Sequence, residues 1–290
     1  MKDVPYCVSE IIDLVFATAR MVSEDLFIHK KILAKILVIL QENAEEDNPA
    51  ELTLACLRAT YQALGVKDPY EKEKARQIRS MLGLENTCRD YINSSSSRLK
   101  ACIRLSSAAC GESLKGLGRE DMEQTLVARL EEKPAINVLD QLIAAAEKAK
   151  KVLIIASGAG ELVADGFLAE ELSKTAQVEV VVANRPLFSR ATAADADAAG
   201  ITKFATVSDP GADMLGIITG RATNTFNEKL ASADLVIAKG SINYLTLAGC
   251  ERGIFHIFRC EREETAQKAG VPRGSGVICF RPGEAHDEED

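Results

Sequence analysis

The spacing of apolar residues predicts that the first part of the chain is helical. From residue 8 to about residue 64, apolar residues recur at intervals of three and four, as in Ile11, Leu14 and Val15. That interval places them on one face of an α-helix, and strand-like alternation is missing from this region. We therefore predict amphipathic helix throughout it.

Turn signals divide the rest of the first half into shorter helices. Glycine, proline and clusters of small polar residues mark these turns and helix ends. The expected features, in chain order, are a stop at Gly65 and the Asp68-Pro69-Tyr70 turn, a charged helix over residues 71–81, a polar loop or N-cap at residues 93–97, a helix over residues 99–109, a glycine-rich turn at residues 111–118 and a helix over residues 138–150.

Beyond residue 150 the pattern changes to short apolar runs that do not alternate with polar residues. Such runs are typical of strands buried on both faces, and the helical stretches between them indicate a mainly parallel sheet. Strand after helix after strand predicts a doubly wound α/β layer. The runs are residues 152–156, 178–182, 235–238, 254–258 and 277–280.

These patterns together predict an α/β protein with two domains. A helical N-terminal domain, residues 1–150, is followed by a doubly wound, mainly parallel α/β/α sheet domain, residues 151–290. The acidic tail from residue 283 to residue 290 is expected to fray.

The composition is that of a folded protein without affinity for nucleic acid. The 290 residues are 47% hydrophobic and 27% charged, which excludes wholesale disorder. The formal net charge is -8, whereas nucleic-acid phosphates are bound by clustered Lys and Arg, and the sequence has no basic arm or stripe. Aromatic residues make up only 5%, so base-stacking platforms are scarce as well.

Nothing in the sequence predicts insertion into a membrane or export. The longest apolar stretches, such as residues 31–40 and 152–156, are much shorter than the roughly 20 residues that span a bilayer. Charged residues between Lys2 and Asp13 interrupt any apolar segment of a signal peptide. We therefore expect a cytoplasmic protein that has no membrane partner.

The cysteines and histidines do not indicate a metal centre. The eight cysteines never occur as Cys-x-x-Cys, and cysteine is among the residues most often buried as a free thiol. The chain has only three histidines, so a tetrahedral zinc site would require distant residues to converge.

In an open parallel sheet, ligands bind beyond the carboxyl ends of the strands, so the residues that follow each run carry the candidate chemistry. We define the first loop as residues 157–161, the second loop as residues 184–190, the third loop as residues 208–213 and the fourth loop as residues 239–244.

The first loop reads Ser-Gly-Ala-Gly-Glu and joins a buried strand to a helix. Free backbone N–H groups and the helix dipole at such a turn favour an anion such as phosphate. Gly158 and Gly160 resemble the start of a dinucleotide fingerprint, but Val163 stands where its third glycine belongs. Glycines at strand-to-helix turns also serve packing alone, and that alternative stays open.

Lys239 follows the apolar run that ends at Ala238, so its ammonium is expected at the same edge of the sheet. A lysine there would meet a phosphate as a point charge, whereas the alternative is an ordinary exposed surface lysine.

These loops, in this order, resemble those of the damage-control phosphatases, also known as domain of unknown function 89. In that family a strand runs into Asp-Asn-Ala-Gly-Glu, with an Asp four residues on. Here Ser157 and Gly158 stand in place of the Asp and the Asn, and Asp165 is present. The second half of the motif is therefore kept and the first half is replaced.

The resemblance continues in the second and fourth loops. The family has a Pro, an Asn-Asp pair, Ala-Thr and then Asp-Ala; here Pro186, residues 191–192 and residues 195–196 match, and the pair has become Ser189-Arg190. The family's later Ala-Asp-Leu-Val-Ile-Ala-Lys-Gly motif is matched from residue 233. Its variable acidic position is a serine, Ser241.

The helical half carries a thinner resemblance. The Asp68-Pro69-Tyr70 turn with Lys74 is similar to the family's Asp-Pro-Tyr motif. The family's Gly-Asn followed by Asp is expected near Gly111, but Glu112 and Lys115 stand there. The Cys-x-x-Cys of many archaeal members is reduced to Cys7 and Glu10.

The resemblance implies a divalent-metal phosphatase that acts on phosphorylated metabolites, with the metal held by the Asp and Asn of the first motif and the Asp of the second. Hard cations require oxygen ligands, which Ser157 and Gly158 do not replace. Arg190 places a fixed positive charge where an anionic ligand stood. We therefore expect no metal cofactor at these residues.

The predicted function is a phosphatase-like fold that binds a phosphorylated small molecule with catalysis weakened or absent. An arginine beside a glycine-rich turn suits a phosphate without any cation. The expected phosphate-binding residues are Gly158, Ala159, Gly160, Glu161, Arg190, Lys239 and Asn243.

Three alternatives stay open. In the first, an active phosphatase uses Mn, Ni or Mg at displaced carboxylates such as Glu161, Asp165, Asp209 or Asp213. Asp209 and Asp213 lie in one loop and are the best candidates, and turn and capping chemistry is the other explanation for them. In the second, a nucleotide-binding enzyme uses the first loop, but Glu179 precedes the end of its strand, which is wrong for a ribose contact. In the third, the protein is an interaction module.

Overall fold

The computed structural model describes residues 4–43, 49–111, 114 and 117–284. The family-like positions Glu112 and Lys115, and the tail from residue 285 to residue 290, lie outside these described residues.

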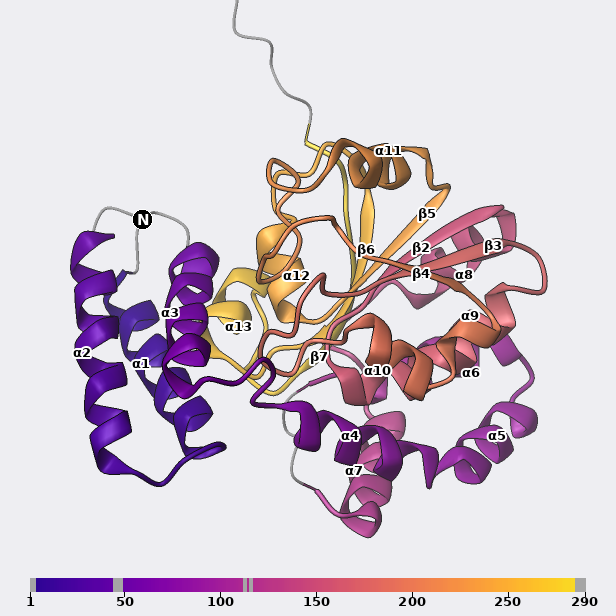
Figure 1. Ribbon diagram of the computed structural model, residues 1–290. Coiled ribbons are helices and arrows are strands. Elements are labelled where there is room, and N and C mark those ends of the chain that lie inside the picture. The colour runs from indigo at the N-terminus through magenta and orange to yellow at the C-terminus, as the bar shows by residue number, and fades with distance from the viewer. Residues whose placement is uncertain (1–3, 44–48, 112–113, 115–116, 285–290) are drawn as a thin grey trace, which may run out of the picture.

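The first part of the chain forms a unit of three helices, α1 (Val4–Arg20), α2 (Leu26–Glu42) and α3 (Pro49–Leu64). The side chain of Asp25 caps α2 by accepting a hydrogen bond from the backbone N–H of Phe27. The unit has a core of its own, built around Ile11, Ile32 and Cys56, and it stands beside the rest of the molecule (Figure 1). The predicted helical region is thus three packed helices.

A second group of helices follows and packs onto the sheet. The group consists of α4 (Glu71–Leu82), α5 (Glu85–Ser94), α6 (Arg98–Ala108), α7 (Arg119–Glu131) and α8 (Leu139–Lys148). Ser97, in the predicted polar loop, caps α6 by accepting a hydrogen bond of 3.3 Å from the N–H of Lys100.

The described strands form one sheet in the order β1-β7-β6-β5-β2-β3-β4. Neighbouring strands are parallel except for the antiparallel pair β6 and β7. The predicted α/β class with a mainly parallel sheet is confirmed. The strands are β1 (Ile136–Asn137), β2 (Lys151–Ile155), β3 (Gln177–Val181), β4 (Thr206–Ser208), β5 (Leu235–Lys239), β6 (Ile254–Arg259) and β7 (Gly276–Arg281).

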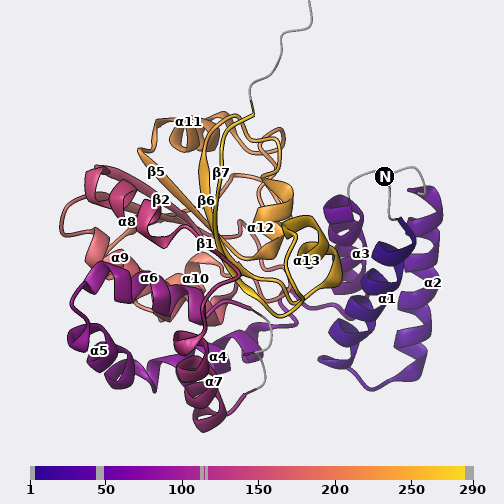
Figure 2. The same ribbon diagram turned by 180° about the vertical axis from the view of Figure 1, so that it is seen from behind.

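Helices cover both faces of the sheet (Figure 2). Alternate strand residues such as Ile154 face a core shared with α4, α6, α8 and α9 (Leu162–Leu172). Residues such as Ile155 face the core shared with α11 (Asn224–Ser232). The remaining elements are α10 (Ala193–Ala198), α12 (Ser241–Thr246), α13 (Glu263–Ala269) and the short 3₁₀ helices η2 (Ala159–Glu161) and η3 (Ile201–Lys203).

The domain boundary expected near residue 150 falls inside the largest core. Residues of α4 to α8 lie in one hydrophobic cluster with strands β2, β3 and β5. In addition, β1 precedes that boundary and pairs with β7. The helices α1 to α3 have a core of their own because their apolar faces are turned toward one another, and α3 also packs with Phe188 and Leu215 in a second cluster.

Among the described residues, no helix is long and apolar enough to cross a membrane.

Candidate active site

The first and second loops lie side by side at the carboxyl edge of β2 and β3. Gly158 and Arg190 form an isolated antiparallel bridge. The N–H of Ala159 donates to the carbonyl of Ser189 at 3.0 Å, and the N–H of Ala191 donates to the carbonyl of Ser157 at 2.9 Å. The structure thus brings together the two segments in which the family-like metal ligands are replaced.

The guanidinium of Arg190 is buried at this junction. The residue is 5% exposed, and its Nη2 donates to the carbonyl of Ala156 at 3.3 Å and to Oδ1 of Asn243 at 3.4 Å. Both contacts are long, and Nε has no hydrogen-bond partner. Within the described residues, no carboxylate forms an ion pair with it. Burial lowers the pKa of Arg190 to about 10, and the charge of Glu161 partly opposes this shift.

Asn243 connects the fourth loop to the ends of β2 and β5. Its Nδ2 donates to the carbonyl of Ala156 at 3.1 Å and to the carbonyl of Lys239 at 2.8 Å. The side chain is fully buried, so the remaining Oδ1 faces Arg190. Asn243 therefore fixes the loop that surrounds the guanidinium.

Lys239 is fully buried and saturated with acceptors. Its Nζ donates to Oδ1 of Asp165 at 2.5 Å, to Oγ of Ser106 at 2.7 Å and to the carbonyl of Ser106 at 2.9 Å. Burial acts to lower the pKa of Lys239, but the carboxylate of Asp165 outweighs it and the pKa is raised. An ammonium has three donors, and all are used here. In this conformation Lys239 has no donor left for a phosphate.

Glu161 lies beside this cluster with one carboxylate oxygen unpaired. Its Oε1 accepts a hydrogen bond from the N–H of Gly111 at 3.4 Å, and its Oε2 lies 3.9 Å from Nζ of Lys239 without a hydrogen-bond partner. Burial raises the pKa of Glu161, and Lys239 opposes the shift. The carboxylate thus points into the region where an anion was expected.

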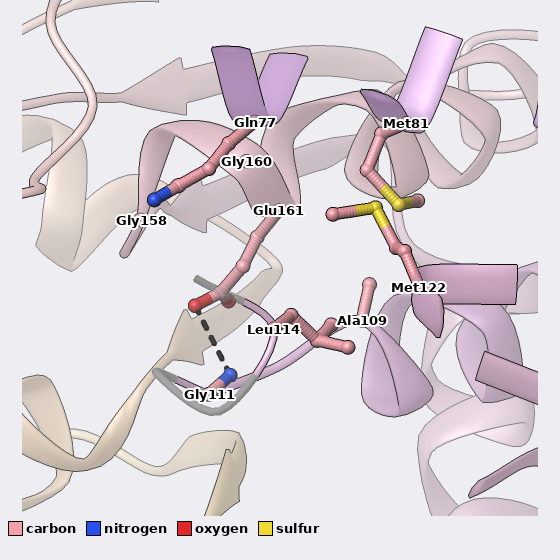
Figure 3. A pocket seen from close by; sticks show the side chains of 9 residues that line it. All are labelled: Gln77, Met81, Ala109, Gly111, Leu114, Met122, Gly158, Gly160 and Glu161. Carbon is pink, nitrogen blue, oxygen red and sulfur yellow. Dashed lines mark hydrogen bonds between the residues drawn. The ribbon is translucent and has the colours of Figure 1, made fainter. Parts of the chain in front are cut away.

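A small cavity adjoins the first loop (Figure 3). Its volume is about 20 Å³, close to the space that one water molecule needs. α4 narrows it, because a Cβ on Gly160 would lie 2.9 Å from Cβ of Gln77. The lining residues are Gln77, Met81, Ala109, Gly111, Leu114, Met122, Gly158, Gly160 and Glu161.

The backbone of the first loop is mostly committed within the protein. The N–H of Ala159 is bonded to Ser189, and the N–H of Glu161 donates to the carbonyl of Gly158 at 3.2 Å. The expected cradle of free N–H groups is therefore reduced. The loop closes on itself because a 3₁₀ turn, and not the α-helix, follows Gly158 directly.

The candidate catalytic carboxylates are held by other groups. Asp165 pairs with Lys239 and also accepts a hydrogen bond of 2.6 Å from Oγ of Ser106. Asp213 accepts two hydrogen bonds from Arg58, at 2.6 and 2.5 Å. Asp209 accepts hydrogen bonds from Nδ2 of Asn184 at 2.8 Å and from the N–H of Gly211 at 2.7 Å. Asp209 and Asp213 thus hold turns and the contact to α3.

The residues at the first and second loops do not fit a divalent cation. Ser157 supplies one neutral hydroxyl, Gly158 supplies no side chain, and Arg190 supplies a positive charge at the bridge between them. Within the described residues, no group of three His, Cys, Asp or Glu side chains is arranged to hold a metal ion. The charge at this position favours an anion over a cation.

The helical half reaches the same region through α4. Nζ of Lys74 lies 2.8 Å from Oδ2 of Asp68 and 2.7 Å from Oδ2 of Asp195, which belongs to α10. The same Asp195 oxygen accepts a hydrogen bond of 2.9 Å from the backbone N–H of Thr192, as part of a capping box, and another of 2.6 Å from the Thr192 hydroxyl. The Asp-Pro-Tyr turn and α10, which follows the second loop, are thereby joined by one buried lysine.

Sequence reasoning missed several contributors. Ser106 lies in the last turn of α6, and nothing in its sequence neighbourhood indicates that it faces Lys239. On α3, Arg58 donates from Nη1 to the carbonyl of Pro186 at 2.8 Å, and the hydroxyl of Tyr61 accepts from the N–H of Phe188 at 2.7 Å. Phe188 has a positive φ of 52°, so these contacts hold a strained turn directly before Arg190.

The amino-acid sequence of this chain is similar to those of known proteins. The model of the damage-control phosphatase ARMT1-like domain matches residues 4–277. A damage-control phosphatase of Archaeoglobus fulgidus is 27% identical over 96% of this chain and 98% of its own length. Another, from Pyrococcus horikoshii, is 27% identical over 90% of this chain and 92% of its own length. An uncharacterised protein of Methanocaldococcus jannaschii is 28% identical over 97% of this chain and 96% of its own length.

A solved structure has the same fold. The crystal structure of a protein from Pyrococcus horikoshii, described as a member of domain of unknown function 89, superimposes with a TM-score of 0.86 at 21% identity. The superposition covers 96% of this chain and 98% of that chain.

Proposed function

Because this chain belongs to the damage-control phosphatase family with the ARMT1-like domain, we propose that it binds a phosphorylated small metabolite without the family's metal-dependent catalysis. The observation that carries this proposal is the buried guanidinium of Arg190. It is 5% exposed, it forms no ion pair with a described carboxylate, and its Nε has no acceptor.

A buried cation without a directly paired carboxylate is costly, the charge of Glu161 offsets only part of that cost, and a bound anion relieves more of it. The carbonyl of Ala156 and the amide of Asn243 give Arg190 only long hydrogen bonds. A phosphate accepts two parallel hydrogen bonds from a guanidinium, which neutral acceptors placed separately do not match. The site therefore has the electrostatic character of an anion site.

The other expected phosphate ligands have smaller roles in this proposal. Lys239 attracts the bound anion only through its charge, because its hydrogen-bond donors are committed to Asp165 and Ser106. A ligand also needs more room than the cavity of about 20 Å³ provides, so the side chain of Gln77 must move away from Gly160. Gln77 is buried, so its amide must leave Oε1 of Glu73 and turn away from Gly160, while its Cβ stays in place with the backbone of α4.

An active phosphatase that uses displaced carboxylates is the second candidate. Glu161 Oε2 and Asp165 Oδ2 favour it, since both are buried oxygens without a hydrogen-bond partner beside Lys239. Such an enzyme would take Mn, Ni or Mg at these oxygens and would hydrolyse a general phosphatase substrate in the presence of the cation.

Isothermal titration calorimetry with inorganic phosphate tests the proposal. The wild type should bind, Arg190→Gln should weaken binding at least tenfold, and Arg190→Lys should retain part of it because the charge remains. Arg98→Gln, an exposed arginine paired with Glu171, is the matched control and should leave binding unchanged. Equal affinity in the wild type and Arg190→Gln would refute the proposal, as would turnover of p-nitrophenyl phosphate that requires a divalent cation.

A further inference from the structure

Two cavities lie beyond the tight space around Glu161. One, of about 680 Å³, lies at the ends of β5 and β6 and is lined by Arg259, Arg262 and Arg273. We name it the arginine chamber. The other, of about 540 Å³, lies between the three-helix unit and the helices α12 and α13, and we name it the apolar groove. Ile242 and Arg262 line both, so the two cavities adjoin.

The arginine chamber is basic in a protein whose net charge is -8. Three arginines and one carboxylate, Glu261, line it. Arg259 is held by Glu132, and Nε of Arg273 donates to the carbonyl of Glu261 at 2.8 Å. Arg273 is exposed and forms no ion pair with a described carboxylate. Its terminal nitrogens are therefore the donors that an entering anion meets.

Arg262 stands at the junction of the two cavities. Its Nη1 lies 3.6 Å from Oε2 of Glu10 on α1, and the two side chains are 41% and 44% exposed. An exposed pair at that distance contributes little, because solvent screens it. A ligand anion can therefore replace Glu10 as the partner of Arg262.

The floor of the apolar groove belongs to a hydrophobic cluster. Phe188 and Leu215 are buried members of that cluster, and Leu14, Ala50 and Ile242 pack against it. The rim is polar and includes Glu10, Arg262 and the pair of Glu264 with Lys268. A concave apolar floor within a polar rim is the usual character of a small-molecule site, and both volumes lie in the usual range of such sites.

We propose that these two cavities together bind an amphipathic anion, with its charged head on Arg262 and Arg273 and its apolar tail in the groove. The positive charges of the arginines favour an anionic head, and the apolar floor of the groove favours an apolar tail. The site does not include Arg190 or the first loop, so this proposal stands independently of the proposed function. The head is a phosphate or a carboxylate, since a guanidinium binds either.

A series of ligands with the same head group and apolar tails of increasing length tests whether the tail binds in the groove. Methyl, butyl and hexyl phosphate are titrated into the full chain by calorimetry, with hexanol as the uncharged control and hexanoate as the alternative head. Each methylene that leaves water contributes up to a factor of about four, so hexyl phosphate should bind at least tenfold more tightly than methyl phosphate. Hexanol should bind at least tenfold more weakly than hexyl phosphate.

Variants test the placement. Arg262→Gln should weaken hexyl phosphate binding several-fold, whereas Glu10→Gln should strengthen it because Arg262 is released. Ala248→Phe narrows the groove and should remove the dependence of affinity on tail length. Ala55→Phe, at an exposed site of α3, is the control and should leave that dependence unchanged. Arg190→Gln should leave the tail dependence intact even if phosphate binding at the first loop is lost. The proposal would be overturned if the affinity did not change with tail length. It would also be overturned if neither Arg262→Gln nor Glu10→Gln changed the affinity for hexyl phosphate.

Discussion

Replacing Lys239 by methionine should destabilise the protein strongly. The change keeps most of the volume but removes the only ammonium that contacts Asp165 among the described residues. Asp165 is 0% exposed, and its Oδ2 already lacks a hydrogen-bond partner, so the carboxylate would remain buried with only the hydrogen bond from Ser106 and no counter-charge in contact. Removing one partner of a buried ion pair costs about 3 to 5 kcal/mol. For a chain of this size that corresponds to a fall in Tm of roughly 6 to 10 °C.

Lys74→Met provides the matched comparison. Lys74 is almost as buried, but the carboxylates of Asp68 and Asp195 are 12% and 13% exposed and keep access to water. Its loss should therefore cost less, about 1 to 3 kcal/mol. The double variant Lys239→Met with Asp165→Leu should recover at least half of the loss, because an apolar pair can replace a buried ion pair.

Urea unfolding followed by circular dichroism measures five proteins: the wild type, Lys239→Met, Lys74→Met, Asp165→Leu and the double variant. The reasoning is wrong if Lys239→Met is no less stable than Lys74→Met, or if the double variant is as unstable as the sum of its two single changes. Either result would mean that the buried ammonium does not balance Asp165.

Further predictions concern the first loop, the strained turn and the pH dependence. Gly160→Ala should cost about 1 to 3 kcal/mol in urea unfolding, since the new Cβ meets Gln77 at 2.9 Å, whereas Gly220→Ala, with open space around it, should cost much less. Tyr61→Phe should cost about 1 to 3 kcal/mol, because the buried N–H of Phe188 loses its acceptor; unchanged unfolding would show that the turn does not depend on α3. The raised pKa of Glu161 makes its ionisation unfavourable in the folded state, so wild-type stability should fall as pH rises through that pKa. Glu161→Gln should lack this loss, so its stability relative to the wild type should increase as pH rises above the ordinary pKa of a glutamate, and parallel stability curves would contradict the raised pKa of Glu161.

Periodicity predicted the elements better than their assembly. The five apolar runs are strands within one residue or so at each end, because runs buried on both faces leave little ambiguity. The short strands β1 and β4 have no run of their own and depend on pairing with β7 and β3. The antiparallel direction of β7 is likewise set by the segment that connects it to β6. The residues of β7 alone do not indicate this direction.

The candidate site was predictable in position but not in contacts. The rule that ligands bind at the carboxyl edge correctly brought Gly158, Arg190, Lys239 and Asn243 into one region. It gave no indication that Lys239 turns away from solvent toward Ser106, because that contact joins residues 133 positions apart. The ion pair of Asp213 with Arg58 also crosses from the sheet to α3, which local sequence cannot show.

Manganese titration tests most directly our proposal that the site around Arg190 binds an anion and no divalent cation. The wild type is compared with a variant carrying Ser157→Asp, Gly158→Asn and Arg190→Asp, which returns the family's ligand types to both loops. Gly158 has room for a side chain, since its Cβ would meet only the flexible carboxylate of Glu161 at 3.2 Å. Calorimetry should show one manganese ion bound per chain of the variant and none in the wild type, and the variant should lose phosphate binding in the absence of metal. Stoichiometric manganese binding by the wild type that Glu161→Gln abolishes would contradict the account.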